Sequence, residues 1–407
     1  MTGNMITVEQ IQKAAEFLKG KVIRTPLVFS PNLSKMTGMK VYLKLENLQE
    51  TGSFKLRGAT LKIGIDRSRI GSMGVVAASA GNHAQGVALA ARRLGMPATI
   101  VMPEWASISK QEATRGYGGE LVLCGKSVGD ALDKAREIAA SGKTFIHPYD
   151  DPDIICGQGT IGLEILGELP DADLVLVPVG GGGLIGGIAT AVKGLRPQAG
   201  IIGVQAAACP SAYMAKKNGE VLHVEARKSL ADGISVKQIG DVNFEILRKH
   251  VDEVVLVEED RIAEAMLMLL ERKKILTEGA GAVPLAALLN GSVSRPGAKV
   301  VLVVSGGNVD SPLLDRVIRM GLSRNGRVMR FSVYLEDIPG SLASLLTLVA
   351  RLQANVLSIR HVRTGKDLPI YLTKVELELE TRGWAHIEEL AGELRAAGYQ
   401  VRTELEE

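Results

Sequence analysis

Short apolar runs alternate with helical patterns between about residue 40 and residue 320 of the chain. The runs show no alternation of polar and apolar positions, as expected for strands that helices cover on both faces. They lie at residues 74–78, 98–102, 120–123, 174–177, 201–204 and 299–304. The Ala-rich segment 84–94 between two of them stops at Gly95 and Pro97, as a helix would. Strands separated by helices predict right-handed βαβ units in a large α/β region.

The pattern changes after residue 321. A polar stretch at 323–327 is a predicted linker, and residues 328–335 then alternate with period two, like a half-buried strand. The remaining predicted elements are a turn at 337–340, a helix at 341–353, a strand at 356–362, a loop at 363–367, a strand at 370–379, a helix at 384–397 and a strand at 399–403. The order βαββαβ is ferredoxin-like. We therefore expect a catalytic region at 1–322 and a separate module at 328–407.

Composition narrows the class of protein. Of 407 residues, 46% are hydrophobic and 23% charged, which is ordinary for globular chains and excludes disorder. A net charge of +3 gives no electrostatic footprint for nucleic acid. The scattered Cys124, Cys156 and Cys209 suit a reducing cytoplasm. Neither a signal peptide nor a membrane span is expected. Glycine is enriched, at 46 residues, without periodicity, so its positions need individual explanations.

Lys55 is a candidate nucleophile. It lies between Gly52 and Gly58 at the predicted start of a helix. There the helix dipole opposes the ammonium charge, which lowers the pKa of the amine and favours Schiff-base chemistry. From this stretch alone, a solvated surface lysine is the preferred interpretation.

Two further segments lie where parallel strands end, the usual place for ligands in open α/β sheets. Residues 79–86 could bind a carboxylate or phosphate at a helix N-terminus, or could be a turn with Asn82 as the helix cap and a structural His83. The four glycines 180–183 could curl around a phosphate, or could only permit tight packing. A dinucleotide site is disfavoured because the next strand ends at Gln205 rather than at an acid.

A fourth turn, residues 305–308, also follows an apolar strand. If the four segments converge, they suit one ligand with a phosphate and a reactive carbonyl, namely pyridoxal phosphate on Lys55.

The segments 52–59, 79–86, 180–184, 277–282 and 305–308 together resemble the motifs of fold-type II pyridoxal-phosphate enzymes, most closely the threonine (serine) dehydratases. The resemblance covers about residues 5–320. It implies two open, twisted, mostly parallel α/β sheets, with a smaller lobe at about 50–150 inserted in a larger one. It implies cofactor contacts from Phe54, Lys55, Asn82, Gly180, Gly181, Gly182, Gly183, Leu184, Glu278 and Ser305. The implied substrate-binding residues are Ser79, Ala80, Gly81, Asn82 and His83.

The resemblance also implies a reaction. Lys55 carries the cofactor and acts as general base in the β-elimination of L-threonine to 2-oxobutanoate and ammonia, and of L-serine to pyruvate. Ser305 faces the pyridine nitrogen, and a neutral hydroxyl there suits elimination. Ala80 replaces the second serine of related racemases, and residues 205–211 lack the acids of a divalent-metal site. A serine dehydratase, a hydroxyaspartate ammonia-lyase and a non-catalytic amino-acid sensor are the alternatives.

The C-terminal module resembles an ACT domain, a small regulatory unit that binds amino acids. The implied effector site, for isoleucine or valine, comprises Asp337, Pro339, Gly340, Ser341, Leu342 and Asn355. The turn would offer backbone N–H groups to a carboxylate. Because ACT units usually pair, a homo-oligomer (dimer or tetramer) is expected, and oligomerisation alone is the alternative role of the module.

Overall fold

The structure, a computed structural model, describes residues 6–364 and 368–403. The chain forms two compact units, Met1–Ser311 and Pro312–Glu407. The second unit begins with helix α14 (Ser311–Arg324). Residues 323–327, predicted as a linker, comprise the end of this helix and the turn that leads into the next strand. None of the helices in the described residues is long and apolar enough to cross a membrane.

The larger sheet of the first unit has six strands in the order β1-β2-β10-β7-β8-β9. Only β1 is antiparallel to its neighbour. The strands are β1 (Leu27–Phe29), β2 (Lys40–Leu45), β7 (Leu174–Pro178), β8 (Gly200–Ala206), β9 (Glu253–Val257) and β10 (Lys299–Val304). Every residue of β7 and β8 is buried, which explains the continuous apolar runs in the sequence. The sequence pattern missed β2, because its Lys44 is buried although charged.

The smaller sheet of the first unit has four parallel strands in the order β5-β4-β3-β6. They are β3 (Val75–Ala78), β4 (Ala98–Met102), β5 (Gly119–Leu123) and β6 (Thr144–Phe145). All four lie in sequence between β2 and β7 of the larger sheet. The predicted fold class, two mostly parallel α/β sheets, is therefore confirmed.

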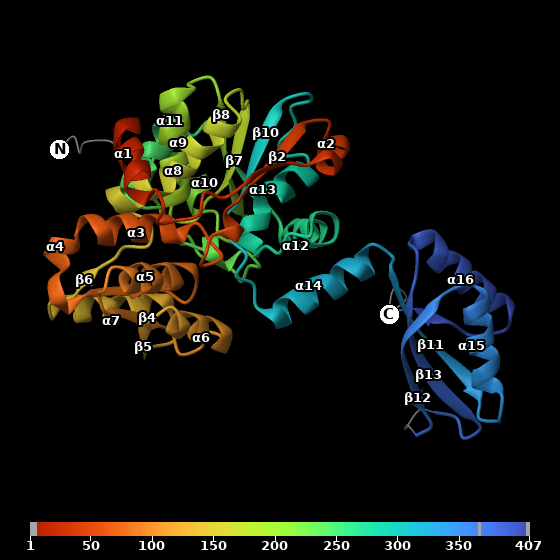
Figure 1. The fold of residues 1–407 in the computed structure, drawn as a ribbon. Helices are drawn as coiled ribbons and strands as arrows, with labels where there is room; N and C mark the ends of the chain where they lie inside the picture. The colour runs from red at the N-terminus through yellow and green to blue at the C-terminus, as the bar shows by residue number, and fades with distance from the viewer. Residues whose placement is uncertain (1–5, 365–367, 404–407) are drawn as a thin grey trace. The chain divides into compact units, whose positions relative to one another are not determined.

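Helices cover both sheets of the first unit. The α-helices are α1 (Val8–Leu18), α2 (Pro31–Thr37), α3 (Lys55–Ile65), α4 (Arg67–Ile70), α5 (Asn82–Arg93), α6 (Ile108–Gly116), α7 (Val128–Ala140), α8 (Pro152–Glu168), α9 (Gly183–Leu195), α10 (Ser211–Asn218), α11 (Asp241–His250), α12 (Glu259–Met268) and α13 (Gly279–Leu289). Helices α8, α9 and α11 lie on one side of the larger sheet, and α12 and α13 on the other (Figure 1). The first of these layers buries Ile161, Ile185 and Leu247 against Val175 and Val177 of β7. Strands β3 and β7 each lead through a short turn into a helix, α5 and α9 respectively, and these turns carry residues of the candidate site.

The second unit contains a four-stranded antiparallel sheet in the order β12-β13-β11-β14. After α14 its elements are β11 (Val328–Glu336), α15 (Ser341–Arg351), β12 (Asn355–Val362), β13 (Leu372–Glu380), α16 (Trp384–Ala396) and β14 (Arg402–Thr403). The order βαββαβ agrees with the predicted ferredoxin-like module. The last strand is shorter than predicted, because the N–H of Tyr399 donates to the carbonyl oxygen of Leu394 in α16 instead of to a neighbouring strand. The predicted loop 363–367 lies partly outside the described residues.

Candidate active site

Lys55 is the first residue of α3. Its Nζ donates a hydrogen bond to the carbonyl oxygen of Pro148 at 2.7 Å and lies 5.2 Å from the centroid of the Phe54 ring. Burial lowers the pKa of the Lys55 amine to about 8, although the charge of Glu278 opposes this shift. Sequence reasoning expected the lowered pKa from the helix dipole, whereas desolvation is the larger cause. The uncharged form of the amine is therefore far more populated near neutral pH than in a lysine with the ordinary pKa of about 10.4.

Asn82 connects two parts of the first unit that are far apart in sequence. Its Nδ2 donates to Oε1 of Glu278 at 2.7 Å, and its Oδ1 accepts from Nδ2 of Asn308 at 2.7 Å. Asn82 is the first residue of α5 and does not cap it, because Gly81 is the N-cap. The alternative interpretation of Asn82 as a capping residue is therefore wrong.

Glu278 is buried at the start of α13, with 6% of its surface exposed. Burial raises the pKa of its carboxyl to about 8, and the nearby charge of Asp232 acts in the same direction. The hydrogen bond from Asn82 partly opposes the shift. Two groups with pKa values pushed toward neutrality, Lys55 and Glu278, thus share one buried environment, which is typical of functional sites.

The loop that leads into α5 leaves a half-buried surface. Ser79, Ala80, Gly81 and Asn82 are each partly accessible. The Ser79 hydroxyl accepts a hydrogen bond from the N–H of Gly81 at 3.1 Å. His83 is buried, with its Nε2 3.0 Å from the carbonyl oxygen of Ile146. Burial, together with the charge of Lys55, lowers the pKa of His83 to about 3, so its ring is uncharged and does not serve as a general acid at neutral pH.

The four glycines 180–183 form the turn between β7 and α9. Gly182 is the N-cap of α9, has a φ of 98° and offers no side chain to the helix. A Cβ on Gly181 would lie 2.3 Å from the Tyr149 ring, and one on Gly182 would lie 2.6 Å from Cβ of Asn243. The first N–H groups of α9, including that of Leu184, have no acceptor within the helix. This uncapped helix start, enclosed by close packing, suits an anion.

Ser305 follows β10 and is 2% exposed. Its carbonyl oxygen accepts the N–H of Phe54 at 3.1 Å, and Ser53 forms an isolated β-bridge with Gly306. The carbonyl oxygen of Gly306 accepts the N–H of Glu278 at 3.1 Å. The lysine segment, the turn after β10 and the start of α13 are thus joined by backbone contacts.

Sequence reasoning missed three contributors. Pro148 receives the bond from Lys55, Tyr149 packs under Gly181, and Asn308 bonds Asn82. Each contact joins positions more than 30 residues apart, so no local pattern could show the first two. Asn308 belongs to the candidate turn 305–308, but the sequence indicates no function for it.

These features fit the pyridoxal phosphate that the motifs imply. Lys55 supplies a buried amine with a lowered pKa for an aldehyde. The N-terminus of α9 supplies free N–H groups for a phosphate. Asn82 has one N–H of its Nδ2 bonded to Glu278, which leaves the other for an oxygen of the ring. In the described part of the chain, no group of three or more His, Cys, Asp or Glu residues is arranged to hold a metal ion.

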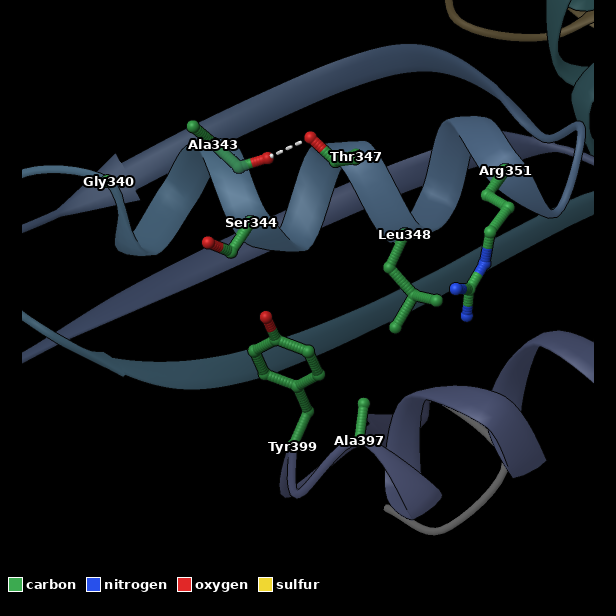
Figure 2. Close-up of a pocket in the computed structure, with 8 residues that line it drawn as sticks. All are labelled: Gly340, Ala343, Ser344, Thr347, Leu348, Arg351, Ala397 and Tyr399. Carbon is green, nitrogen blue, oxygen red and sulfur yellow. Dashed lines mark hydrogen bonds between the residues drawn. The ribbon is translucent and has the colours of Figure 1, made fainter.

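A pocket in the second unit lies between α15 and the chain that follows α16 (Figure 2). It is an open pocket with a volume of about 550 Å³. Its lining residues are Gly340, Ala343, Ser344, Thr347, Leu348, Arg351, Ala397 and Tyr399. Figure 2 shows the Tyr399 hydroxyl pointing toward Ser344. The pocket thus combines small apolar side chains with hydroxyl groups and one guanidinium.

Of the six predicted effector residues, Gly340 lines this pocket, at the N-cap of α15. Asp337 instead forms an ion pair with Arg363 at 3.2 Å, and Asn355 donates to Glu380 at 3.4 Å.

Three comparisons place the chain among known proteins. A family model described as "Pyridoxal-phosphate dependent enzyme" matches residues 18–306. The chain is 50% identical over 399 residues to an L-threonine ammonia-lyase from Thermotoga maritima, covering 98% of this chain and 99% of the relative. It is 46% identical over 327 residues to the L-threonine dehydratase catabolic TdcB of Staphylococcus aureus, covering 79% of this chain and 94% of the relative. The structure matches the processed form of threonine deaminase isoform 2 from Solanum lycopersicum with a TM-score of 0.73 and 36% identity, covering 77% and 93% of the two chains.

Proposed function

The chain belongs to the pyridoxal-phosphate-dependent enzyme family, and from this membership we propose that it converts L-threonine to 2-oxobutanoate and ammonia. The observation that carries the proposal is the buried Lys55 amine, next to the linked Asn82 and Glu278, in a chain half identical to a threonine ammonia-lyase along nearly its whole length. L-Serine, which differs from threonine by one methyl group, is the expected second substrate and yields pyruvate.

The side chains divide the work of the reaction. When bound, pyridoxal phosphate withdraws electrons from the amino acid and so acidifies its Cα–H bond. The uncharged Lys55 amine accepts the Cα proton at Nζ. The C–O bond at Cβ breaks, the hydroxyl leaves as water, and addition of water at Cα then releases ammonia and the 2-oxo acid. Threonine is thus converted to 2-oxobutanoate and ammonia with no net gain or loss of water.

The other residues of the site bind and orient the cofactor and the substrate. Backbone N–H groups at the start of α9 would hold the phosphate, and the half-buried loop from Ser79 to Asn82 would receive the substrate carboxylate. The buried Ser305 would give the pyridine nitrogen of the cofactor a neutral hydroxyl partner. The uncharged His83 adds no competing proton donor.

A substrate panel tests the proposal. We expect kcat/KM for L-threonine to exceed that for L-serine and 3-hydroxyaspartate, measured as 2-oxo acid release by the purified holoenzyme. A preference for serine or hydroxyaspartate would assign one of the alternative ammonia-lyase activities. A protein that binds no cofactor and releases no 2-oxo acid would support the non-catalytic sensor instead.

We further propose that the second unit is an ACT-type regulatory domain that binds isoleucine or valine, in a homo-oligomer. Its βαββαβ order supports this assignment, and the uncapped N-terminus of α15 at Gly340 suits a carboxylate. Repeating the substrate panel with each amino acid added tests the regulation, and unchanged kinetics would refute it. The three free thiols, Cys124, Cys156 and Cys209, support a cytoplasmic location.

A further inference from the structure

Asn308 has no role in the mechanism above, yet it joins two segments of the candidate active site. Its Nδ2 donates to the carbonyl oxygen of Thr51 at 2.8 Å and to Oδ1 of Asn82 at 2.7 Å. A third acceptor, Oε1 of Gln85, lies at 3.4 Å. Thr51 precedes Lys55 by four residues, and Asn82 opens α5. One side-chain amide therefore connects the lysine segment with the asparagine loop.

The polarity of these bonds allows only one orientation of each amide. The Thr51 carbonyl only accepts, so Asn308 must turn its Nδ2 toward it. The same Nδ2 faces Asn82, whose side chain must then present Oδ1 to Asn308. Asn82 is left with Nδ2 toward the carboxyl of Glu278, again an acceptor. Each hydrogen bond in the series therefore has one donor and one acceptor, from the carbonyl oxygen of Thr51 at one end to the carboxyl of Glu278 at the other.

The surrounding backbone is shaped to keep Asn308 in place. A Cβ on Gly52 would lie 2.4 Å from Oδ1 of Asn308, and the φ of Gly52 is +70°. The N–H of Gly307 donates to the carbonyl oxygen of Gly52 at 2.9 Å. The turn after β10 is therefore held against the lysine segment both beside Asn308 and through it.

We propose that Asn308 is a positioning residue that fixes the orientation of the Asn82 amide, so that Asn82 offers an N–H donor to the bound cofactor. This inference rests on the proposed function and extends it to a residue that acts through Asn82. Its basis is the hydrogen-bonded series Thr51–Asn308–Asn82–Glu278.

The Asn308→Asp variant tests the proposal with almost no change of shape. An aspartate offers only acceptors to Thr51 and Asn82, so Asn82 must turn its Oδ1 toward the cofactor or lose a partner. We expect the Kd for pyridoxal phosphate to rise about tenfold, the effect of one well-formed hydrogen bond to a charged group. The absorption maximum of the bound cofactor should also shift. Asn308→Ser, which keeps one donor for two acceptors, should change both quantities in the same direction.

Two comparisons separate positioning from general destabilisation. Asn47 is half-buried, like Asn308, and donates to the Leu276 carbonyl oxygen at 3.0 Å with no hydrogen bond to Asn82. Asn47→Asp should leave the Kd and the spectrum unchanged. In a double-mutant cycle, Asn308→Asp should alter the Kd less than about twofold when Asn82 is already alanine, because its effect passes through Asn82.

Equal effects of Asn308→Asp in the parent and Asn82→Ala proteins would overturn the proposal, as would an unchanged Kd and spectrum in the single variants. These readouts do not depend on which amino acid the enzyme deaminates. A failure of the threonine assignment is therefore distinguishable from a failure of this one.

Discussion

Burial, more than sequence position, sets the protonation of the residues in the candidate site. Lys55 starts a helix, as the sequence predicted, but removal of its amine from water is the main reason for its pKa of about 8. The same desolvation keeps the His83 ring uncharged and raises the pKa of the Glu278 carboxyl to about 8. At the residue scale, burial therefore makes the charged forms of these side chains energetically unfavourable in the absence of a ligand.

The pKa of Lys55 predicts how the apoprotein takes up its cofactor. The uncharged amine is the nucleophile, so the rate of pyridoxal phosphate binding should rise as the pH approaches 8 and level off above it. A lysine with the ordinary pKa of about 10.4 would show a rate that still rises beyond pH 9. Stopped-flow absorbance between pH 6.5 and 10 measures this profile.

The same pH dependence of the cofactor-binding rate, measured on the Glu278→Gln variant, tests the effect of Glu278 on Lys55. Removing a carboxylate that raises the pKa of Lys55 should move the plateau to lower pH. A plateau that moved upward, or a parent rate still increasing at pH 10, would contradict the proposed electrostatics.

The residues found from sequence and those missed differ in the range of their contacts. Lys55, Asn82 and the glycines 180–183 lie at predictable ends of strands or starts of helices, so local patterns identified them. Tyr149 and Asn308 act through residues distant in sequence, and nothing in their own segments signals those contacts. Lys44 shows the same limit for the fold, because its charge hid a buried strand.

At the scale of elements, loops around the site are held by packing that allows only glycine. The turn between β7 and α9 lies against Tyr149 and Asn243, so its backbone approaches its neighbours too closely for a Cβ. A rigid turn keeps the first N–H groups of α9 aimed at one point, and that preorganisation is what phosphate binding needs.

The Gly181→Ala variant tests this arrangement. Its Cβ would lie 2.3 Å from the Tyr149 ring, so the turn must shift and cofactor affinity should fall by about tenfold or more. Gly392→Ala in α16 is the matched control, since nothing lies within 4 Å of its added Cβ. Equilibrium dialysis of pyridoxal phosphate gives both values, and an unchanged affinity in Gly181→Ala would show that the turn adapts freely.

Helix α3, which carries Lys55, is anchored by a buried ionic network. Arg57 bonds Oε2 of Glu46 at 2.9 Å and Oε1 of Glu164 at 2.6 Å, and Lys44 bonds Oε2 of Glu164 at 2.6 Å. Although burial alone would lower the pKa of Arg57, the two carboxylates raise it. The charges of two buried cations and two buried anions thus compensate one another, and Arg57 lies two residues after the reactive Lys55.

Removing one side chain of this ionic network should therefore lower the free energy of unfolding substantially. Arg57→Ala leaves two carboxylates without their partner, and the free energy of unfolding should fall by about 3–5 kcal/mol. Arg248→Ala, which removes an exposed pair with Glu245, should change it by less than about 1 kcal/mol. Urea denaturation of the two apoproteins measures both changes. Equal losses of unfolding free energy would show that the buried network stabilises the fold no more than an exposed ion pair does.

At the scale of the whole molecule, the candidate active site and the proposed regulatory site belong to different units. Every residue of the candidate active site precedes Ser311, and the second unit has its own core around Val333, Leu345 and Leu390. The glycine enrichment of the chain belongs in part to the first unit, where glycines 180–183 enclose the helix start. The near-neutral charge agrees with a small zwitterionic substrate bound by local dipoles.

Ending the chain after residue 327 tests this division. The shortened protein should keep its kcat for threonine within about threefold, because a domain with its own core folds alone. The full chain should respond to isoleucine or valine by about fivefold or more in kcat/KM, a normal size for allosteric coupling, and the shortened protein should not. A response that survives the truncation would place the effector site in the first unit.

The most direct test of the account is 2-oxobutanoate release from L-threonine by the parent protein and by Lys55→Ala, each saturated with pyridoxal phosphate. The parent should turn over, and Lys55→Ala should lose at least about 10³-fold in kcat, because it lacks the group that accepts the Cα proton. A Lys55→Ala protein that released 2-oxobutanoate at the parent rate would contradict the central claim.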